Sequence, residues 1–545
     1  MRLIASWLFP VLLLLLGLAL YMPGIGRLDL WDLQEMRLAE AAREMLATGE
    51  YYRLQVNFKP TWDLGPLAVW WHALGIQAFG LNEVAIRFPN ACMACLALLS
   101  VFFVGRRLHE GDFGFIWALL AFCPLGVYAL MRTGLAEPAY GFFTFLAVSG
   151  LAFSSDKRLR GGAPGLAAMA GFFLGLAVLA DGVVALLVVG LLVLFVWLLN
   201  GGRPLFAGSD VVILVLATSL TTILWFGYEW AANGPEFLQG LFNGPTFRLG
   251  TDEPGRTPLL PTRLLLLGLG LFPTAWLAVG PLIRYREKDP ADFRKWMMVL
   301  VWILLAQLVL FPNMSLSVVA TVAYPLGYLA TLFIVQPVRR TAFGGRGLWA
   351  SVMSVMFLLG LSSFLLPVLL AAQTPWLWKR LATGGYLPGE PWSGYEGLAG
   401  WVLLLAAVPV FRFGRAQQPI QATLVTALAL LLFGGLSYPF LGRGIQQMVQ
   451  GPYPRLFAQT AGHHGYAAAI TFKSYAPLFY GQRKPGLPCN GMADSCFLKR
   501  LVAQPVYKVV PAWSFGSGKH LAGFEEIDRA GPYVLFKRFE PYGNQ

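Results

Sequence analysis

Long apolar runs recur along the chain and are separated by short polar segments. LFPVLLLLLGLALYM (8–22) and VVALLVVGLLVLFVWLL (183–199), for example, contain no charged residue. Because a helix needs about 20 apolar residues to cross a bilayer core, such runs predict transmembrane helices. The segment 66–81 is apolar but shorter, and we place it at the membrane interface. We predict thirteen spans, at 4–23, 86–105, 113–131, 137–154, 164–180, 182–199, 209–229, 260–283, 296–312, 316–336, 348–371, 397–412 and 419–440.

The composition supports a membrane protein and excludes a cytosolic enzyme. The chain has 545 residues, of which 57% are hydrophobic and 13% charged, and its mean hydropathy is +0.60. An ordinary soluble domain carries about 25% charged residues. No small-residue cleavage site follows the first apolar run, which predicts a retained span and not a signal peptide.

The basic residues fall in alternate connecting segments. The formal net charge of +13 would suggest a nucleic-acid partner in a soluble protein, but here the positive-inside rule explains it and we expect no nucleic acid. The rule places the N-terminus in the cytoplasm and, with an odd span count, the C-terminal tail outside. The segments assigned to the cytoplasm contain Arg2, Arg106, Arg107, Lys157, Arg158, Arg160, Arg203, Arg284, Arg286, Lys288, Arg294, Lys295, Arg339, Arg340, Arg346, Arg412 and Arg415.

The composition changes from residue 443 onward. The runs 466–472, 505–510 and 531–539 have the apolar or alternating character of strands, and the segments between them suit short helices. We therefore predict an all-α polytopic membrane domain at 1–442, with a long first outer loop at 24–85, and a small exported α/β domain at 443–545.

Two of the five cysteines lie in this exported domain. Cys489 and Cys496 bracket the sequence PCNGMADSC, and an oxidising compartment favours a local disulfide between them. The alternative is a zinc site, which needs about four ligands, and His463–His464 is the nearby histidine pair. We favour the disulfide, and we expect no metal.

The first outer loop is too long for a simple connector. Its segment 33–49 has strong helix formers and ends at a glycine. We predict an amphipathic helix whose apolar side lies on the membrane. Its charged side would face outward and consists of Glu35, Arg37, Glu40, Arg43 and Glu44.

Acidic residues gather before and at the start of this helix. Asp29, Asp32 and Glu35 are spaced three residues apart. They have two interpretations: acids that cap and stabilise the positive end of the helix, or an acid group at the membrane face that acts as a general base.

Two stretches of this loop resemble a known family. LWDLQEMRLAEAAREMLATGEYY (30–52) and TWDLGPLAVWWHALGIQAFGLNEVAIRFPNA (61–91) are similar to the first outer loop of GT-C glycosyltransferases. The likeness is nearest to the lipid A aminoarabinose transferases and more distant to protein O-mannosyltransferases. It extends to the span count, the orientation, the AEP step at 136–138 and the C-terminal α/β domain.

This resemblance implies a membrane enzyme without a cofactor, at the periplasmic face of a Gram-negative inner membrane. A sugar linked to undecaprenyl phosphate would be the donor, and lipid A, a glycan or a protein of the envelope the acceptor. An acid in the first loop would deprotonate or orient the acceptor hydroxyl. Basic side chains would stabilise the departing phosphate.

The chain departs from the family pattern at several functional positions. Gln34 stands at the position of the catalytic aspartate, and Asp32 is the nearest replacement. Leu64 stands at the phosphate-binding lysine, and Lys59 is the nearest replacement. Glu137 replaces an aspartate before Pro138, Asp181 replaces a lysine after the fifth span, and MSLSVVA (314–320) lacks the lysine of a later motif.

The candidate site follows from these positions. Asp32 and Glu35 are the catalytic candidates, Asp63, Glu137 and Asp181 are further acids, and the phosphate-binding candidates are Lys59, Arg248, Arg256 and Arg132. Arg132 has an equally good interpretation as an anchor to anionic headgroups. The missing acid and lysines favour an alternative function, a non-catalytic relative that binds a lipid-linked glycan or accompanies an active membrane enzyme as its partner. A transporter has less support, because we find no duplicated halves.

Overall fold

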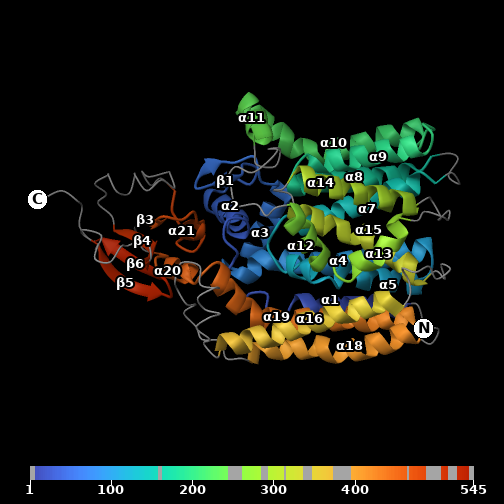
Figure 1. Cartoon of the computed structure of the whole chain (residues 1–545). Coiled ribbons are helices and arrows are strands. Elements are labelled where there is room, and N and C mark those ends of the chain that lie inside the picture. The colour runs from blue at the N-terminus through green and yellow to red at the C-terminus, as the bar shows by residue number, and fades with distance from the viewer. Residues whose placement is uncertain are drawn as a thin grey trace, which may run out of the picture.

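The computed structural model describes residues 7–156, 162–243, 260–283, 293–311, 315–335, 346–371, 395–462, 466–485, 505–512 and 524–538. These residues form a large helical part and a small sheet at one end of it (Figure 1). The predicted fold class, a polytopic helical membrane domain with a small C-terminal α/β domain, is confirmed. Arg248, Arg256, Cys489, Cys496 and the pair His463–His464 lie outside the described residues.

The described helices have the following bounds: α1 (Leu8–Tyr21), α2 (Glu35–Thr48), α3 (Pro66–Phe79), α4 (Glu83–Leu108), α5 (Gly111–Phe122), α6 (Leu125–Leu130), α7 (Glu137–Ser154), α8 (Pro164–Asp181), α9 (Val184–Leu199), α10 (Gly208–Asn233), α11 (Pro235–Asn243), α12 (Leu260–Gly270), α13 (Thr274–Ile283), α14 (Phe293–Leu310), α15 (Ser315–Val335), α16 (Arg346–Ala371), the 3₁₀ helix η4 (Tyr395–Ala399), α18 (Gly400–Arg415), α19 (Pro419–Val449), α20 (Tyr453–Ala458) and α21 (Ala476–Phe479).

Each of the thirteen predicted spans coincides with a helix or with two consecutive helices. Within the described ranges, eight helices are long and apolar enough to cross a membrane, or nine if the pair α12 and α13, bent by 106°, counts as one span. Helices α1, α5 and α9 are apolar but shorter. The chain is therefore a multi-pass membrane protein, and the count of about thirteen spans stays a prediction. Two of the predicted spans, 113–131 and 260–283, are each divided near a proline, which lacks an N–H donor: Pro124 separates α5 from α6, and Pro273 separates α12 from α13.

Close backbone contacts hold the helices of the membrane domain together. A Cβ atom on Gly171 of α8 would lie 2.4 Å from the carbonyl oxygen of Leu214 on α10, and one on Gly114 of α5 would lie 2.4 Å from that of Phe102 on α4. Small residues at such positions let helices approach closely, which is the main source of packing energy between helices in lipid. A larger side chain at either position would push the two helices apart.

The first outer loop folds onto the helices and does not extend away from them. It contains α2, a hairpin of β1 (Gln55–Val56) and β2 (Lys59–Pro60), and α3. The prediction that the charged side of α2 faces outward is wrong, because Glu35, Glu40 and Glu44 are fully buried. Met36 and Ala39 of the apolar side pack against the C-terminal domain and not against lipid. Helix α2 therefore lies between two layers of protein.

The C-terminal domain has a four-stranded sheet of β3 (Tyr466–Ala469), β4 (Val506–Pro511), β5 (Glu525–Ala530) and β6 (Tyr533–Arg538) in the order β3-β4-β6-β5. β3 and β4 are parallel, and the other neighbours are antiparallel. Three strands were predicted, whereas β5, with the polar sequence EEIDRA and a mostly exposed surface, was not. Helix α19 crosses the predicted domain boundary at 442, so that boundary stays a prediction.

Candidate active site

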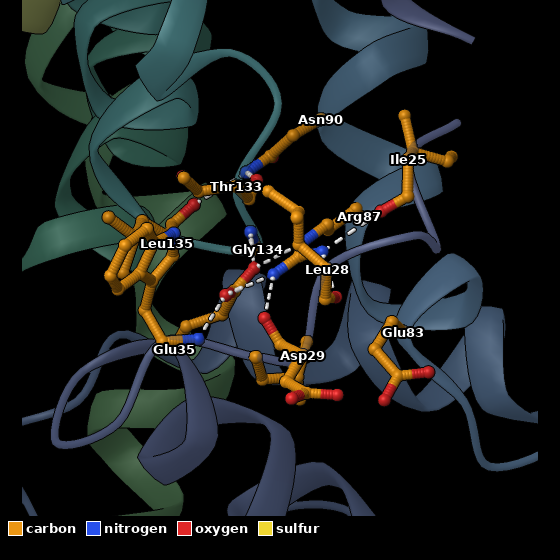
Figure 2. Close-up of polar contacts among 12 residues, drawn as sticks. Ile25, Leu28, Asp29, Glu35, Glu83, Arg87, Asn90, Thr133, Gly134 and Leu135 are labelled. Carbon is orange, nitrogen blue, oxygen red and sulfur yellow. Dashed lines mark hydrogen bonds and ion pairs between the residues drawn. The ribbon is translucent and has the colours of Figure 1, made fainter. Parts of the chain in front are cut away.

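A buried ion pair fixes the base of the first outer loop (Figure 2). Arg87 of α4 and Glu35 of α2 are both fully buried, and Nε and Nη2 of Arg87 each donate to one oxygen of Glu35 at 2.8 Å. The same guanidinium donates to the carbonyl oxygens of Ile25, Leu28 and Asp29. One arginine thus joins α4 to the entire segment that leads into α2.

The carboxylate of Glu35 is also fully occupied. Besides Arg87, it accepts from the backbone N–H of Trp31 at 2.7 Å and of Gly134 at 2.6 Å. Burial acts to raise its pKa, but the charge and hydrogen bonds of Arg87 outweigh burial and hold the pKa of Glu35 below its usual value. An ionised carboxylate with every bond made inside the protein is a structural group. Glu35, predicted as catalytic, therefore has no geometry that reaches a substrate.

Asp32, the other predicted catalytic acid, joins the loop to the C-terminal domain. Its carboxylate accepts from the hydroxyl of Tyr453 at 2.5 Å and from the backbone N–H of Tyr475 at 2.9 Å. It also accepts from the N–H of Leu33, which lies just outside α2. Asp32 does not cap α2, because that helix begins at Glu35 and its N-cap residue Gln34 makes no side-chain cap. The contacts give Asp32 a role in docking the two parts of the chain.

Of the predicted phosphate-binding residues, the structure describes Arg132 and Lys59, and neither lines the cleft described below. Arg132 is buried and donates to the carbonyl oxygens of Leu20 and Pro23, and its guanidinium lies 3.9 Å from the ring centroid of Tyr438. Because Arg132 is buried, its guanidinium cannot contact a donor phosphate or a lipid headgroup. Lys59 is exposed on the β1–β2 hairpin.

A cleft lies between the first outer loop and the ends of three helices. It contains two of the predicted acids, Asp63 and Asp181. Its lining comes from the loop before α3, the α8–α9 turn, α10 and α11: Trp62, Asp63, Leu64, Gly65, Pro66, Val178, Asp181, Gly182, Val183, Trp225, Phe226 and Leu241.

Asp63 is held in place by the first outer loop itself. Arg37 donates to its Oδ1 at 2.6 Å, and the hydroxyl of Thr61 donates to the same oxygen at 2.6 Å. Burial acts to raise the pKa of Asp63, but the hydrogen bond and the charge of Arg37 outweigh it, so the pKa lies below its usual value. Asp63 is thus an ionised carboxylate at the cleft.

Asp181 approaches the cleft from the membrane domain. It ends α8, and its Oδ2 accepts from the hydroxyl of Ser317 on α15 at 2.7 Å. Glu137, at the start of α7, is close enough to interact with it electrostatically. Gly65 brings the loop against this helix end, since a Cβ atom on Gly65 would lie 1.9 Å from the carbonyl oxygen of Ala180. The structure therefore brings Asp63, Asp181 and Glu137 into one region, while Asp32 and Glu35 do not line the cleft.

A second pair of acids, Glu40 and Glu44, lies on α2. Arg43 forms two hydrogen bonds of 2.7 Å with Glu40. Glu44 accepts from the backbone N–H groups of Asn57 and Phe58, at 2.6 and 2.7 Å. Asn57 and Phe58 form the β1–β2 turn, with φ of 59° and 55°. Glu44 therefore stabilises a left-handed turn that lies shortly before the cleft residues 62–66 in the sequence.

Stability should therefore depend on the protonation of Glu44. Burial first, and then the neighbouring Glu40, raise the pKa of Glu44 to about 9. A folded-state pKa above the ordinary value near 4.5 means that the contribution to stability is complete below about pH 4.5 and declines as the pH rises toward 9. We expect Glu44→Gln to lose less stability than the wild type between pH 5 and pH 9, measured as the melting temperature of the purified protein. Glu50→Gln, which changes a side chain that is 48% exposed, is the control and should follow the wild type. A Glu44→Gln curve parallel to the wild type would contradict this assignment.

Several residues of this region were not singled out in the sequence. Arg37 and Arg87 lie in the stretches that resemble the family, but nothing there showed which acids they pair with. Glu229, buried on α10, accepts from the indole N–H of Trp62 at 3.0 Å. An acid near the end of an apolar span is a usable signal, because ionisable groups in membrane segments are costly. The sequence GYEW (227–230) carries that signal.

Comparisons with known proteins agree with this architecture. No protein-family model matches the chain. An undecaprenyl phosphate-alpha-4-amino-4-deoxy-L-arabinose arabinosyl transferase of Pseudomonas fluorescens is 27% identical over 217 residues, 39% of this chain and 39% of the relative. An uncharacterized protein of Aquifex aeolicus is 27% identical over 238 residues, 42% of this chain and 45% of the relative. The matches thus span less than half the length of these relatives.

The solved structures extend the likeness to nearly the whole chain. The crystal structure of ArnT from Cupriavidus metallidurans bound to undecaprenyl phosphate has a TM-score of 0.72 and 16% sequence identity, and the match covers 97% of both chains. The apo structure of the same protein has a TM-score of 0.70 and 17% identity, with the same coverage. The chain therefore has the fold of ArnT over nearly its whole length.

Proposed function

We propose that the chain is a glycosyltransferase that moves a sugar from a polyprenyl-phosphate donor to an acceptor of the bacterial envelope. The observation that carries the proposal is the acidic cleft under the first outer loop, in a chain whose fold follows that of an undecaprenyl-phosphate-binding protein over 97% of its length. The relatives named as aminoarabinosyl transferases support the same class of donor. Lipid A, a glycan and a protein remain the candidate acceptors.

The position of the cleft suits a donor that is anchored in lipid. Helix α10 supplies Trp225 and Phe226 to the cleft. Of the residues of α10, all of which the structure describes, only Asp210, Trp225 and Glu229 are buried. Apart from the side that packs against α8, the surface of this hydrophobic helix faces the hydrocarbon. An isoprenoid tail can therefore lie beside α10 while its head group enters the cleft.

The reaction requires one acid and one source of positive charge. We assign Asp181 to the acceptor: its carboxylate takes the hydroxyl proton as the hydroxyl oxygen bonds to the anomeric carbon. The bond between that carbon and the phosphate oxygen breaks, and the phosphate leaves with the electron pair. Asp63, ionised through Arg37, orients the sugar. These roles use groups within reach of the cleft, as general acid–base catalysis demands.

The positive charge is proposed to come from the segment that follows α11. None of the described residues that line the cleft is a lysine or an arginine, and Leu64 lies there in place of the lysine that the resemblance implies. Helix α11 contributes Leu241 to the cleft and ends at Asn243, and Arg248 and Arg256 follow in the sequence. Arginine suits a phosphate because its planar fork donates two hydrogen bonds at once.

We propose that the N-terminus faces the cytoplasm and the C-terminal domain the periplasm, as the alternation of basic segments indicates. The cleft then opens at the periplasmic face, where no nucleotide sugar pool exists. A lipid-linked donor meets that constraint because it is delivered through the membrane.

Transfer of a labelled sugar tests the proposed function. Purified full-length protein would be given radiolabelled sugars on undecaprenyl phosphate together with an envelope extract. Label that moves to lipid A, glycan or protein supports the enzyme and names the acceptor. Binding of the carrier without any transfer would support the non-catalytic alternative. That alternative is suggested by Gln34 and Leu64, which stand where the resembling family has its catalytic aspartate and its phosphate-binding lysine. Absence of both binding and transfer would overturn the proposal.

A further inference from the structure

One wall of the cleft is an indole whose position is set from two sides. Trp62 lines the cleft, and its Nε1 donates to Oε2 of Glu229 at 3.0 Å. The six-membered ring of Trp62 lies against Gly240 of α11, where a Cβ atom would come within 2.1 Å of Cε3. Neither contact leaves the ring free to turn.

Glu229 is an unusual residue for this purpose. It is fully buried on a helix whose other buried residues are Asp210 and Trp225, and its Oε2 also accepts from the side-chain amide of Asn233 at 2.7 Å. Its Oε1 has no hydrogen-bond partner among the residues that the structure describes. A buried carboxylate with an unsatisfied oxygen costs free energy, and such costs are usually retained where they serve a site. Because Glu229 accepts the hydrogen bond of the Trp62 indole, its role here is to orient that indole.

The remaining chemistry of the cleft fits a sugar ring. Trp62 stands with Trp225 and Phe226 on the walls, and the carboxylates Asp63 and Asp181 are the charged groups of the lining. Small-molecule sites typically combine aromatic walls with a few placed polar groups, and the lining of the cleft has both. The carboxylates accept hydrogen bonds from hydroxyl or ammonium groups and repel an anion.

We propose that Trp62 is the platform on which the sugar ring of the donor stacks, and that Glu229 and Gly240 are positioning residues that hold this platform. The site takes a sugar that is neutral or carries an amine, and it rejects one that carries a carboxylate. The proposal rests on the proposed function, since it places the sugar of a lipid-linked donor in the cleft.

Binding of two kinds of carrier to the full-length protein in nanodiscs tests the platform. The probes are bare undecaprenyl phosphate and undecaprenyl phosphate that carries a neutral hexose, an amino-pentose or a hexuronic acid. We expect the wild type to bind at least one neutral or amino-sugar carrier about tenfold more tightly than the bare carrier, the size of effect that aromatic stacking plus hydrogen bonds can supply. The uronic-acid carrier should have no such advantage.

The variants separate the platform from general stability. Trp62→Ala should bring the sugar carrier to within about twofold of the bare carrier and leave bare-carrier binding unchanged. Glu229→Leu and Gly240→Ala should have the same effect although both retain Trp62, because the first releases the indole and the second pushes it into the cleft. Glu229→Gln keeps an acceptor oxygen and should resemble the wild type. Trp70→Ala is the matched control: its indole also donates to a neighbour, the carbonyl of Tyr51, but Trp70 does not line the cleft.

Each outcome decides a different point. Equal preference for the sugar carrier in Trp62→Ala, Gly240→Ala and the wild type would overturn the platform, and the proposed function would stand if transfer persists. Tight binding of the uronic-acid carrier would overturn the charge selectivity. A wild type that binds no carrier at all would overturn the proposed function itself. Melting temperatures of all variants show whether a loss of binding reflects unfolding.

Discussion

Arg87→Leu, on α4, is expected to prevent the chain from folding stably, because Arg87 holds the start of the first outer loop. It leaves the fully buried carboxylate of Glu35 without its counter-charge and removes the donor to the carbonyls of Ile25, Leu28 and Asp29. Breaking a buried ion pair by removing one partner costs about 3–5 kcal/mol, because an uncompensated charge remains. That loss is comparable with the whole stability of many domains, about 5–15 kcal/mol. The yield of monodisperse protein and its melting temperature measure the effect.

Two further variants identify the cause of this loss. The double variant Glu35→Leu with Arg87→Leu should be more stable than Arg87→Leu alone, since it leaves no unpaired charge, although the carbonyls of Ile25 and Leu28 still lose their donor; the carbonyl of Asp29 keeps the side-chain amide of Gln446. Arg455→Leu is the control, because the pair of Arg455 with Asp29 is long, at 4.0 Å, and its side chains are 45% and 29% exposed. An exposed pair contributes about 0–1 kcal/mol. If Arg87→Leu and Arg455→Leu melted alike, the ion pair would not be the element that holds the loop.

Asp181→Asn is expected to lower sugar transfer by about 100-fold or more, the usual contribution of a positioned general base. The amide keeps the size of the side chain and can still accept from Ser317, but it cannot take up the proton of the acceptor hydroxyl. Binding of undecaprenyl phosphate should change little, because the assigned role concerns the acceptor. Initial rates of transfer with the radiolabelled donor, together with carrier affinity, separate the two effects.

Comparison with Asp32→Asn tests whether Asp181 or Asp32 is the general base. Asp32 bonds to Tyr453 and Tyr475 of the C-terminal domain, so its amide variant should affect the melting temperature and leave transfer within about threefold of the wild type. Asp112→Asn, in the first turn of α5, is the control and should change neither quantity. Abolished transfer in Asp32→Asn with normal transfer in Asp181→Asn would return the catalytic role to the residue predicted from the sequence.

The contrast between Asp32, Glu35 and Asp181 shows why the sequence could not tell which acids face the cleft. All three are acids near the end of a predicted element, and the family resemblance made Asp32 and Glu35 the catalytic candidates. The fold places Asp181 at the cleft and the other two outside its lining. Arg87 comes from α4, some fifty positions away in the chain, and occupies Glu35 completely. Asp181 lies far from the first loop in the sequence and meets it only because Gly65 lets the backbone approach the end of α8.

The orientation of α2 has the same explanation. Its alternation of apolar and charged positions is real, and such a helix normally lies at a water interface. Here Arg43 neutralises Glu40, and the β1–β2 turn binds Glu44, so the charged side is buried among specific partners. Hydrophobic patterning describes one helix at a time and contains no information on partners from elsewhere in the chain.

By itself, the sequence determined the membrane character, the helical segments, the strands β3, β4 and β6, and the GT-C resemblance. These properties depend on runs of neighbouring residues, whose hydropathy and turn signals act locally. Only the tertiary structure decided which acids face the cleft, which are locked in ion pairs, and that Trp62 is held between Glu229 and Gly240. The physical reason is that burial and pairing of a charge depend on groups brought together from distant parts of the chain, and the free energy of a charge depends on those groups more than on its neighbours in sequence.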